Sequence, residues 1–224
     1  MKHFFSWDGP LLRFFDKVGK VMIASMLWLL TSIPIVTTGL ASTALYYSVV
    51  KAIRNDRDYV LSQYYGALRR EWKQGLLFGV LYLLAFALLL LDVIAWHEEG
   101  TKRGMLLFLI CAAAMLLLAV SAVYVFSLIS RFEMGFRDVL KISFFLEFRY
   151  LPSSVGIALI LGTSVGLIFL SPYTVLFVPG AACFLISFLT EKIYQNIIPE
   201  PADGQEQWYD KKNKEEYDAN QETV

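Results

Sequence analysis

Charged residues are scarce in this sequence, and several long stretches contain none. Asp, Glu, Lys and Arg make up 18% of the 224 residues, hydrophobic residues make up 57%, and the mean hydropathy is +0.53. No charge occurs within 75–91, 105–130 or 151–190. A bilayer core about 30 Å thick is spanned by roughly 20 apolar residues in a helix, and a soluble fold this small could not bury three such stretches. The composition therefore predicts an all-α, polytopic membrane helical bundle.

Three other signals are missing from the sequence: an excess of charge of one sign, a disulfide framework and a signal peptide. The formal net charge is +0, so no attraction to nucleic acid is expected. The two cysteines, Cys111 and Cys183, lie inside hydrophobic stretches and are expected to pack as small apolar residues rather than to form a disulfide. The N-terminus has no short apolar core followed by a small-residue cleavage site, so we expect no signal peptide.

The hydrophobic stretches predict six membrane helices, at about 18–33, 38–53, 75–96, 105–129, 152–170 and 173–190. The first two are short, because Pro34 removes a backbone donor and, with Gly39, breaks the first stretch. They are expected either to cross the bilayer as two arms or to form a re-entrant hairpin.

Basic residues predict which side each loop faces, because Lys and Arg favour cytoplasmic loops. With the first stretch broken at Pro34–Gly39, 18 of the 20 Lys and Arg residues fall on one side, and only Lys102 and Arg103 fall on the other. We therefore expect both termini in the cytoplasm.

The two ends of the chain differ from the membrane domain, which is expected at 18–198. Residues 1–17 place apolar side chains beside Arg13, Asp16 and Lys17, which predicts an interfacial amphipathic helix. Residues 199–224 are polar, and from Glu200 onward they hold eight acidic residues against three lysines. They are expected to be a disordered cytoplasmic tail.

The break in the first stretch is a candidate binding or structural motif, formed by Pro34, Thr37, Thr38 and Gly39. A helix broken at membrane depth exposes carbonyls and amides that protein, water or a ligand must satisfy, and such breaks build substrate sites in transporters. The same residues also suit a plain turn, with the threonine hydroxyls capping the second helix.

The basic connectors between predicted spans form a candidate docking surface. The connectors near 57–73 and 131–149 match at an offset of 80 residues, and each is expected to lie on the cytoplasmic face as an amphipathic helix. There the basic side chains can contact anionic lipid headgroups. The surface is formed by Arg57, Tyr64, Tyr65, Arg69, Arg137, Phe144, Phe145 and Arg149.

No catalytic or metal-binding constellation is evident. His3 and His97 are predicted near opposite faces of the membrane, and no Gly-rich phosphate-binding loop occurs. Asp92 is the one ionisable residue well inside a predicted span, and it lies one helical turn from Trp96 near the outer interface. We expect no enzyme, cofactor or metal site, and so little buried charge argues against a proton- or sodium-coupled transporter.

The sequence resembles the YesL-like family of bacterial membrane proteins, a domain of unknown function. The resemblance is carried by the runs LWLL at 27–30, PIVTTG at 34–39 and ALY at 44–46, and by RREWKQ at 69–74. It implies a multi-pass protein of the bacterial cytoplasmic membrane, encoded beside carbohydrate ABC transporters. An accessory, non-enzymatic role in carbohydrate uptake follows as the leading expectation, with transporter subunits as partners. The alternative is a small independent carrier with its site at the broken first hairpin.

Overall fold

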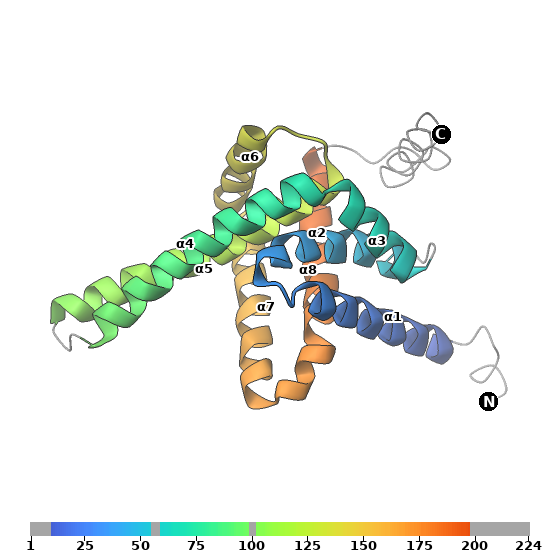
Figure 1. Cartoon of the computed structure of the whole chain (residues 1–224), viewed down its shortest axis with the longest axis horizontal. Coiled ribbons are helices and arrows are strands. Elements are labelled where there is room, and N and C mark those ends of the chain that lie inside the picture. Colours follow the sequence, from blue (N-terminus) through green and yellow to red (C-terminus); the bar gives the residue numbers. More distant parts are fainter. Residues whose placement is uncertain (1–9, 55–58, 99–101, 198–224) are drawn as a thin grey trace.

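The computed structural model describes residues 10–54, 59–98 and 102–197, and every regular element in these ranges is helical. The all-α prediction is confirmed for this part of the chain (Figure 1). The α-helices are α1 (Pro10–Thr31), α2 (Thr38–Ser48), α3 (Val60–Arg70), α4 (Trp72–Glu98), α5 (Lys102–Arg131), α6 (Phe136–Arg149), α7 (Leu151–Leu170) and α8 (Val178–Ile197). Two 3-10 turns, η1 (Ile35–Thr37) and η3 (Pro172–Leu176), and a π-helical segment, η2 (Val49–Arg54), complete the order.

The first hydrophobic stretch is broken where the sequence predicts it. Helix α1 ends at Thr31, and α2 begins at Thr38 after the 3-10 turn. The predicted boundary between an interfacial helix 1–17 and a span 18–33 does not appear, since α1 runs without interruption from Pro10. The amphipathic first half and the apolar second half continue as one helix, and Gly19 at their junction is helical and does not end it. Residues 1–9 of the predicted interfacial helix lie outside the described residues.

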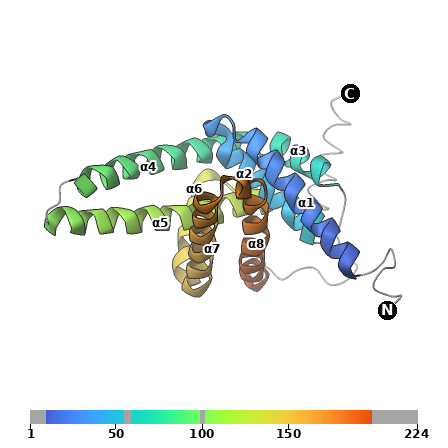
Figure 2. The same cartoon turned by 90° about the horizontal axis from the view of Figure 1, so that it is seen from below.

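Helices α2 and α4 cross at three glycines. A Cβ built on Gly39 would lie 2.4 Å from the Cα of Gly79 and 2.9 Å from the carbonyl oxygen of Gly75. Gly75 and Gly79 form a small-xxx-small pair, which lets two helix backbones approach closely. The glycines therefore bring α4 against α2, which is itself almost entirely buried at the centre of the molecule (Figure 2).

Three of the described helices are long and apolar enough to cross a membrane: Trp72–Trp96, Arg103–Arg131 and Leu151–Leu170. They include the predicted spans 75–96, 105–129 and 152–170. Helices α4 and α5 lie side by side as a long hairpin that projects away from the rest of the bundle in both views (Figures 1 and 2). Only 17% of the most apolar stretch of α4 and 11% of that of α5 are buried, as is typical of helices that contact lipid. The chain therefore has the features of a membrane protein, while the six-span count and the cytoplasmic termini stay predictions.

The last predicted span, 173–190, differs from the helix observed. Pro172 and the residues after it form the turn η3, and α8 begins only at Val178 and continues to Ile197. The helix therefore extends past the apolar run and carries Glu191 and Tyr194 into the bundle, where both are buried. The predicted span ends at residue 190 because hydropathy alone stops at the first charge. Both residues were therefore expected just beyond the span, on its cytoplasmic side.

Candidate functional site: a central cavity and a basic connector surface

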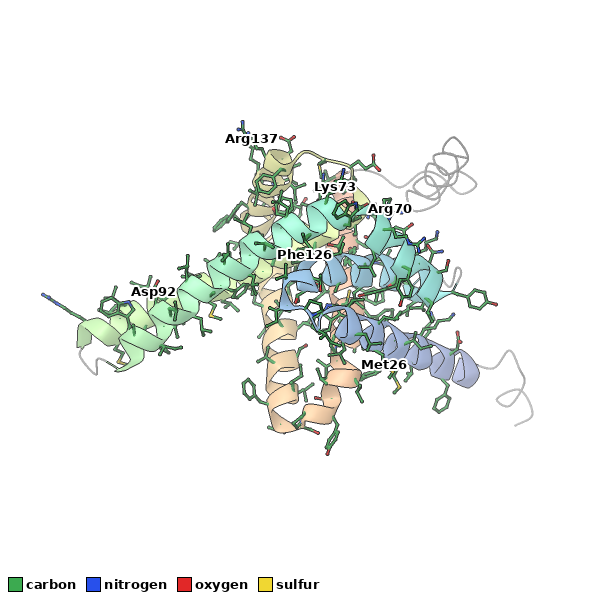
Figure 3. The ribbon with its side chains drawn as sticks, in the orientation of Figure 1. Met26, Arg70, Lys73, Asp92, Phe126 and Arg137 are labelled. Atoms are coloured by element: carbon green, nitrogen blue, oxygen red, sulfur yellow. The ribbon has the colours of Figure 1, made fainter. Side chains whose placement is uncertain are left out.

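A cavity of about 300 Å³ lies among α1, α2, α5, α7 and α8. Its walls are mostly apolar. Phe126 of α5 lines it and lies near the centre of the molecule, where the helices converge (Figure 3). Trp28 of α1 closes one side, and its indole N–H donates to the Ser42 hydroxyl across the first hairpin at 3.1 Å. The polar lining consists of the hydroxyls of Ser42, Tyr46, Ser127 and Ser164 together with the Trp28 indole.

Two of these hydroxyls connect the cavity to a buried ion pair. The Tyr46 hydroxyl donates to Glu191 Oε1 at 2.9 Å, and the other oxygen of that carboxylate pairs with Arg131 Nη1. The Ser127 hydroxyl bonds the hydroxyl of Tyr194, whose ring lies 5.4 Å from the Arg131 guanidinium carbon. Arg131 and Glu191 are both less than one-tenth exposed. The cavity therefore ends at a charged and hydroxyl-rich cluster contributed by α2, α5 and α8.

The π-helical segment η2 brings further cations into the same region. Lys51 is fully buried, and Arg54 donates to the Ser187 backbone carbonyl of α8 at 2.9 Å. A π-helical turn adds a residue to the helix and redirects the side chains that follow it, and such turns recur at functional sites. Here it directs the end of α2 toward α8.

A second polar cluster lies where α4, α5, α6 and α7 meet. The hydroxyls of Tyr82 and Ser121 are 2.8 Å apart, and the Tyr124 hydroxyl bonds Ser154, which donates to the Glu147 backbone carbonyl. The Glu147 carboxyl is 2% exposed, and burial raises its pKa to about 7.

These buried charges were not found in the sequence analysis. Arg131 and Glu147 lie in a predicted connector, and Glu191 directly follows the last predicted span, where charge is expected to be solvated. The expectation that little charge is buried was therefore wrong. A partial signal was available for the ion pair, since Ser127 and Ser130 precede Arg131 and Tyr194 follows Glu191 within one helical turn.

The turn residues Pro34, Thr37, Thr38 and Gly39 do not line the cavity. The hydroxyls of Thr37 and Thr38 donate to the carbonyls of Pro34 and Ile35, each at 2.7 Å, so they satisfy the turn rather than cap the N–H groups of α2. Gly39 is occupied by the helix crossing. These four residues therefore shape the turn of the first hairpin. The cavity is lined instead by residues of the two helices of that hairpin, α1 and α2.

The start of α4 contacts both connectors: α3 ends just before it in the chain, and the segment that begins α6 packs against it. Gln74 donates to the Met134 carbonyl at 3.0 Å, and the rings of Phe78 and Phe136 stack with centroids 4.5 Å apart. Arg70, Lys73 and Arg137 mark this region in Figure 3. We define the connector surface by the predicted docking residues that are exposed in the structure: Tyr65, Arg69, Arg137, Phe144, Phe145 and Arg149.

Two of the predicted docking residues are not in this surface. Tyr64 is fully buried, and its hydroxyl bonds Thr31 of α1, so it cannot anchor a partner as predicted. It faces inward because Val60, Gln63, Tyr64 and Ala67 form the covered face of α3. Arg57 lies outside the described residues.

Comparison with known proteins places this chain among proteins of undefined activity. Residues 21–93 match the family model described as "Protein of unknown function, DUF624". The chain is 26% identical to "Uncharacterized protein YesL" of Bacillus subtilis (strain 168) over 198 residues, which cover 86% of this chain and 87% of the relative. No solved structure matches the chain. The predicted resemblance to the YesL-like family is confirmed by the first two matches.

Proposed function

We propose that this YesL-like chain is a non-enzymatic accessory component of carbohydrate uptake, which docks subunits of a carbohydrate ABC transporter on its connector surface. The single observation that carries the proposal is the exposure of aromatic and basic side chains on two amphipathic helices: α3, which directly precedes α4, and α6, whose first residue stacks on Phe78 of α4. The family resemblance supplies the carbohydrate context.

The chemistry of the connector surface suits such a role. Aromatic side chains supply the apolar anchors of protein interfaces, and arginine is enriched there. Phe145 is 62% exposed, and Arg149 lies one turn further along the same helix. The same side chains can contact lipid headgroups, and the charge-reversal variants below separate that role from docking.

The cavity favours an accessory role over a sugar carrier. A sugar-binding site has to satisfy many hydroxyl groups, because an unpaired polar group is costly when buried. Apart from Trp28, four hydroxyl-bearing residues line the cavity, and each of their hydroxyls already donates to a protein acceptor. The cavity therefore suits an apolar or amphipathic molecule better than a carbohydrate.

Affinity capture from native membranes tests the docking proposal. Wild-type protein should bring down identified subunits of a carbohydrate ABC transporter. The double variant Arg69→Glu with Arg149→Glu should recover at least about tenfold less of them, equivalent to about 1.4 kcal/mol. Insertion is checked by protease protection, since neither residue lies in a membrane-length helix.

A matched control reverses one charge at the other end of the molecule. Arg103 is exposed near the far end of the α4–α5 hairpin, so Arg103→Glu should leave capture unchanged. Equal capture by wild type and the double variant would remove the connector surface from the proposal. Absence of any transporter subunit in the wild-type sample would refute the accessory role itself.

The second candidate function is an independent carrier of an apolar or amphipathic molecule, favoured by the 300 Å³ cavity beside the first hairpin. Filling the cavity with Ala182→Phe should abolish transport of such a molecule in liposomes. The same substitution should leave transporter capture intact, which separates the two functions.

A further inference from the structure

Glu147 stands apart from the other buried charges. Neither oxygen of its carboxyl has a hydrogen-bond partner within the described residues, although the side chain is 2% exposed. The nearby hydroxyls are already engaged with each other: Tyr82 with Ser121, and Tyr124 with Ser154. By contrast, the buried carboxylate of Glu191 holds Arg131 and Tyr46.

The groups around Glu147 supply no compensating positive charge. Tyr82 from α4 and Tyr124 from α5 are the titratable groups on which its charge acts, and both are neutral at physiological pH. Helix α7 contains no acidic or basic residue. The pKa of Glu147 is raised to about 7 by burial alone, with no contribution from a described lysine, arginine or histidine. An ionised carboxylate is therefore unfavourable here, whereas a neutral carboxylic acid is tolerated.

Glu147 lies on the face of α6 that packs on the bundle, so its charge affects how closely α6 can pack. Val139, Ser143, Leu146 and Glu147 form the buried face of this helix, which packs mainly on α5. We propose that Glu147 is a proton-binding site: the protonated carboxyl lets α6 seat on the bundle, and its deprotonation opens that face of the helix to water.

Opening follows from the solvation of the carboxylate. When the carboxyl O–H bond breaks, the proton passes to water. A negative charge then remains in the buried interface between α6 and the helices on which it packs. That charge needs water or donor groups, which the closed interface does not offer. Admitting water requires the inner face of α6 to move away from α5. The site does not depend on the proposed function, because it concerns α6 whether or not a transporter subunit docks there.

Thiol labelling of full-length protein in lipid nanodiscs tests the proposal. In a background of Cys111→Ala and Cys183→Ala, the probe is Ser143→Cys, on the buried face one turn from Glu147. Its labelling rate is divided by that of Lys141→Cys, an exposed position on the same helix, which cancels the ionisation of the thiol itself. The ratio should rise about tenfold between about pH 6 and about pH 8.

Two substitutions assign this change to Glu147. Glu147→Gln imitates the protonated acid, so the ratio should stay low at both pH values. Glu133→Gln removes an exposed carboxyl just before α6 and should keep the wild-type pH dependence. If Glu147→Gln does not insert, Glu147→Met takes its place as an uncharged side chain of similar length.

Three results would overturn the proposal. A ratio that is flat with pH in the wild type would show that the carboxyl does not control α6. A pH dependence that survives in Glu147→Gln would place the titrating group elsewhere. Protection restored at about pH 8 by sodium or potassium ions would identify a metal cation, not a proton, as the ligand.

Discussion

Helices α3 and α6 occupy matching places in the chain, 80 residues apart, yet they bury different chemistry. Gln63 and its counterpart Ser143 are both buried. One turn later the matching pair is Ala67 and Glu147, an alanine in one helix and an unpartnered carboxyl in the other. Two amphipathic helices with the same pattern of covered positions can therefore differ in whether their seating responds to pH.

The helices that follow the two connectors, α4 and α7, differ in how closely they pack on their neighbours. On the α3 side, α4 packs on α2 through Gly75, Gly79 and Gly39. The positions 80 residues after the two α4 glycines are Val155 and Leu159, which are more than half exposed on α7. Helix α7 therefore does not pack on α5 as closely as α4 packs on α2. The cavity lies partly between α5 and α7. Glycine at a crossing point lets two helices pack closely, whereas larger side chains keep them apart.

The largest effect is expected at the buried ion pair that joins Arg131, at the end of α5, to Glu191 of α8. Arg131→Met should lower the free energy of unfolding by about 3–5 kcal/mol, because Glu191 would be left buried without its cation. Adding Glu191→Gln should restore most of the loss. Asp16→Asn, which breaks an exposed pair with Lys20 at 2.8 Å, should cost less than about 1 kcal/mol. SDS titration of detergent-solubilised protein compares the three variants with the wild type, and equal losses at both pairs would contradict the assignment.

The difference between Glu147 and Ala67 should appear as a pH dependence of stability. The folded-state pKa of about 7 lies above the ordinary value of 4.5, so the folded chain holds the proton more tightly. Stability is therefore greatest below about pH 4.5 and falls as pH rises through about 7, by up to about 3 kcal/mol. Glu147→Ala, which copies the α3 residue, should remove this decrease. Unfolding midpoints at a series of pH values measure it, and an undiminished slope in Glu147→Ala would refute it.

The crossing of α2 and α4 should tolerate no side chain. Gly39→Ala places a methyl group against the backbone of Gly79 and should cost about 1–3 kcal/mol. Gly166 of α7 has nothing within 4 Å of a built Cβ, so Gly166→Ala should be neutral or stabilise the helix by up to about 1 kcal/mol. Thermal unfolding followed by size-exclusion fluorescence compares the two. Similar melting temperatures would show that the packing of α2 on α4 does not depend on glycine at position 39.

The smallest effect concerns another matched pair, Tyr64 of α3 and Phe144 of α6. Tyr64→Phe removes the hydroxyl that bonds Thr31 and should cost about 1 kcal/mol. Phe144→Tyr adds a hydroxyl to a side chain that is half exposed, so it should change stability by less than about 0.5 kcal/mol. The same unfolding assay applies, and a larger loss at Phe144 would mean that α6 packs more closely than α3.

Much of the fold was predictable because long apolar runs and helix breakers act locally. The runs that end near Trp96, Arg131 and Leu170 correspond to the three membrane-length helices. Pro34 stops α1 because a proline cannot continue the backbone hydrogen bonds of the preceding turn. The amphipathic connectors were also predictable as helices, although not which of their aromatic residues face inward.

The candidate site was far less predictable. Tyr46 and Glu191 are 145 residues apart in the sequence, and Arg131 and Glu191 are 60 apart. Hydropathy ended the last span at Glu191 because a charge is costly in lipid. It carries no information about a cation from another helix that would make burial possible.

The amino-acid sequence by itself determined the membrane class of the chain, its membrane-length helices and the break in the first hairpin, since each depends on neighbouring residues meeting the same bilayer or backbone constraint. Only the tertiary structure decided the cavity, the Arg131–Glu191 pair and the burial of Glu147. An amphipathic pattern specifies that one face of a helix is covered, but the covering residues come from distant helices. Whether a buried charge is paired, neutralised or solvated depends on those residues.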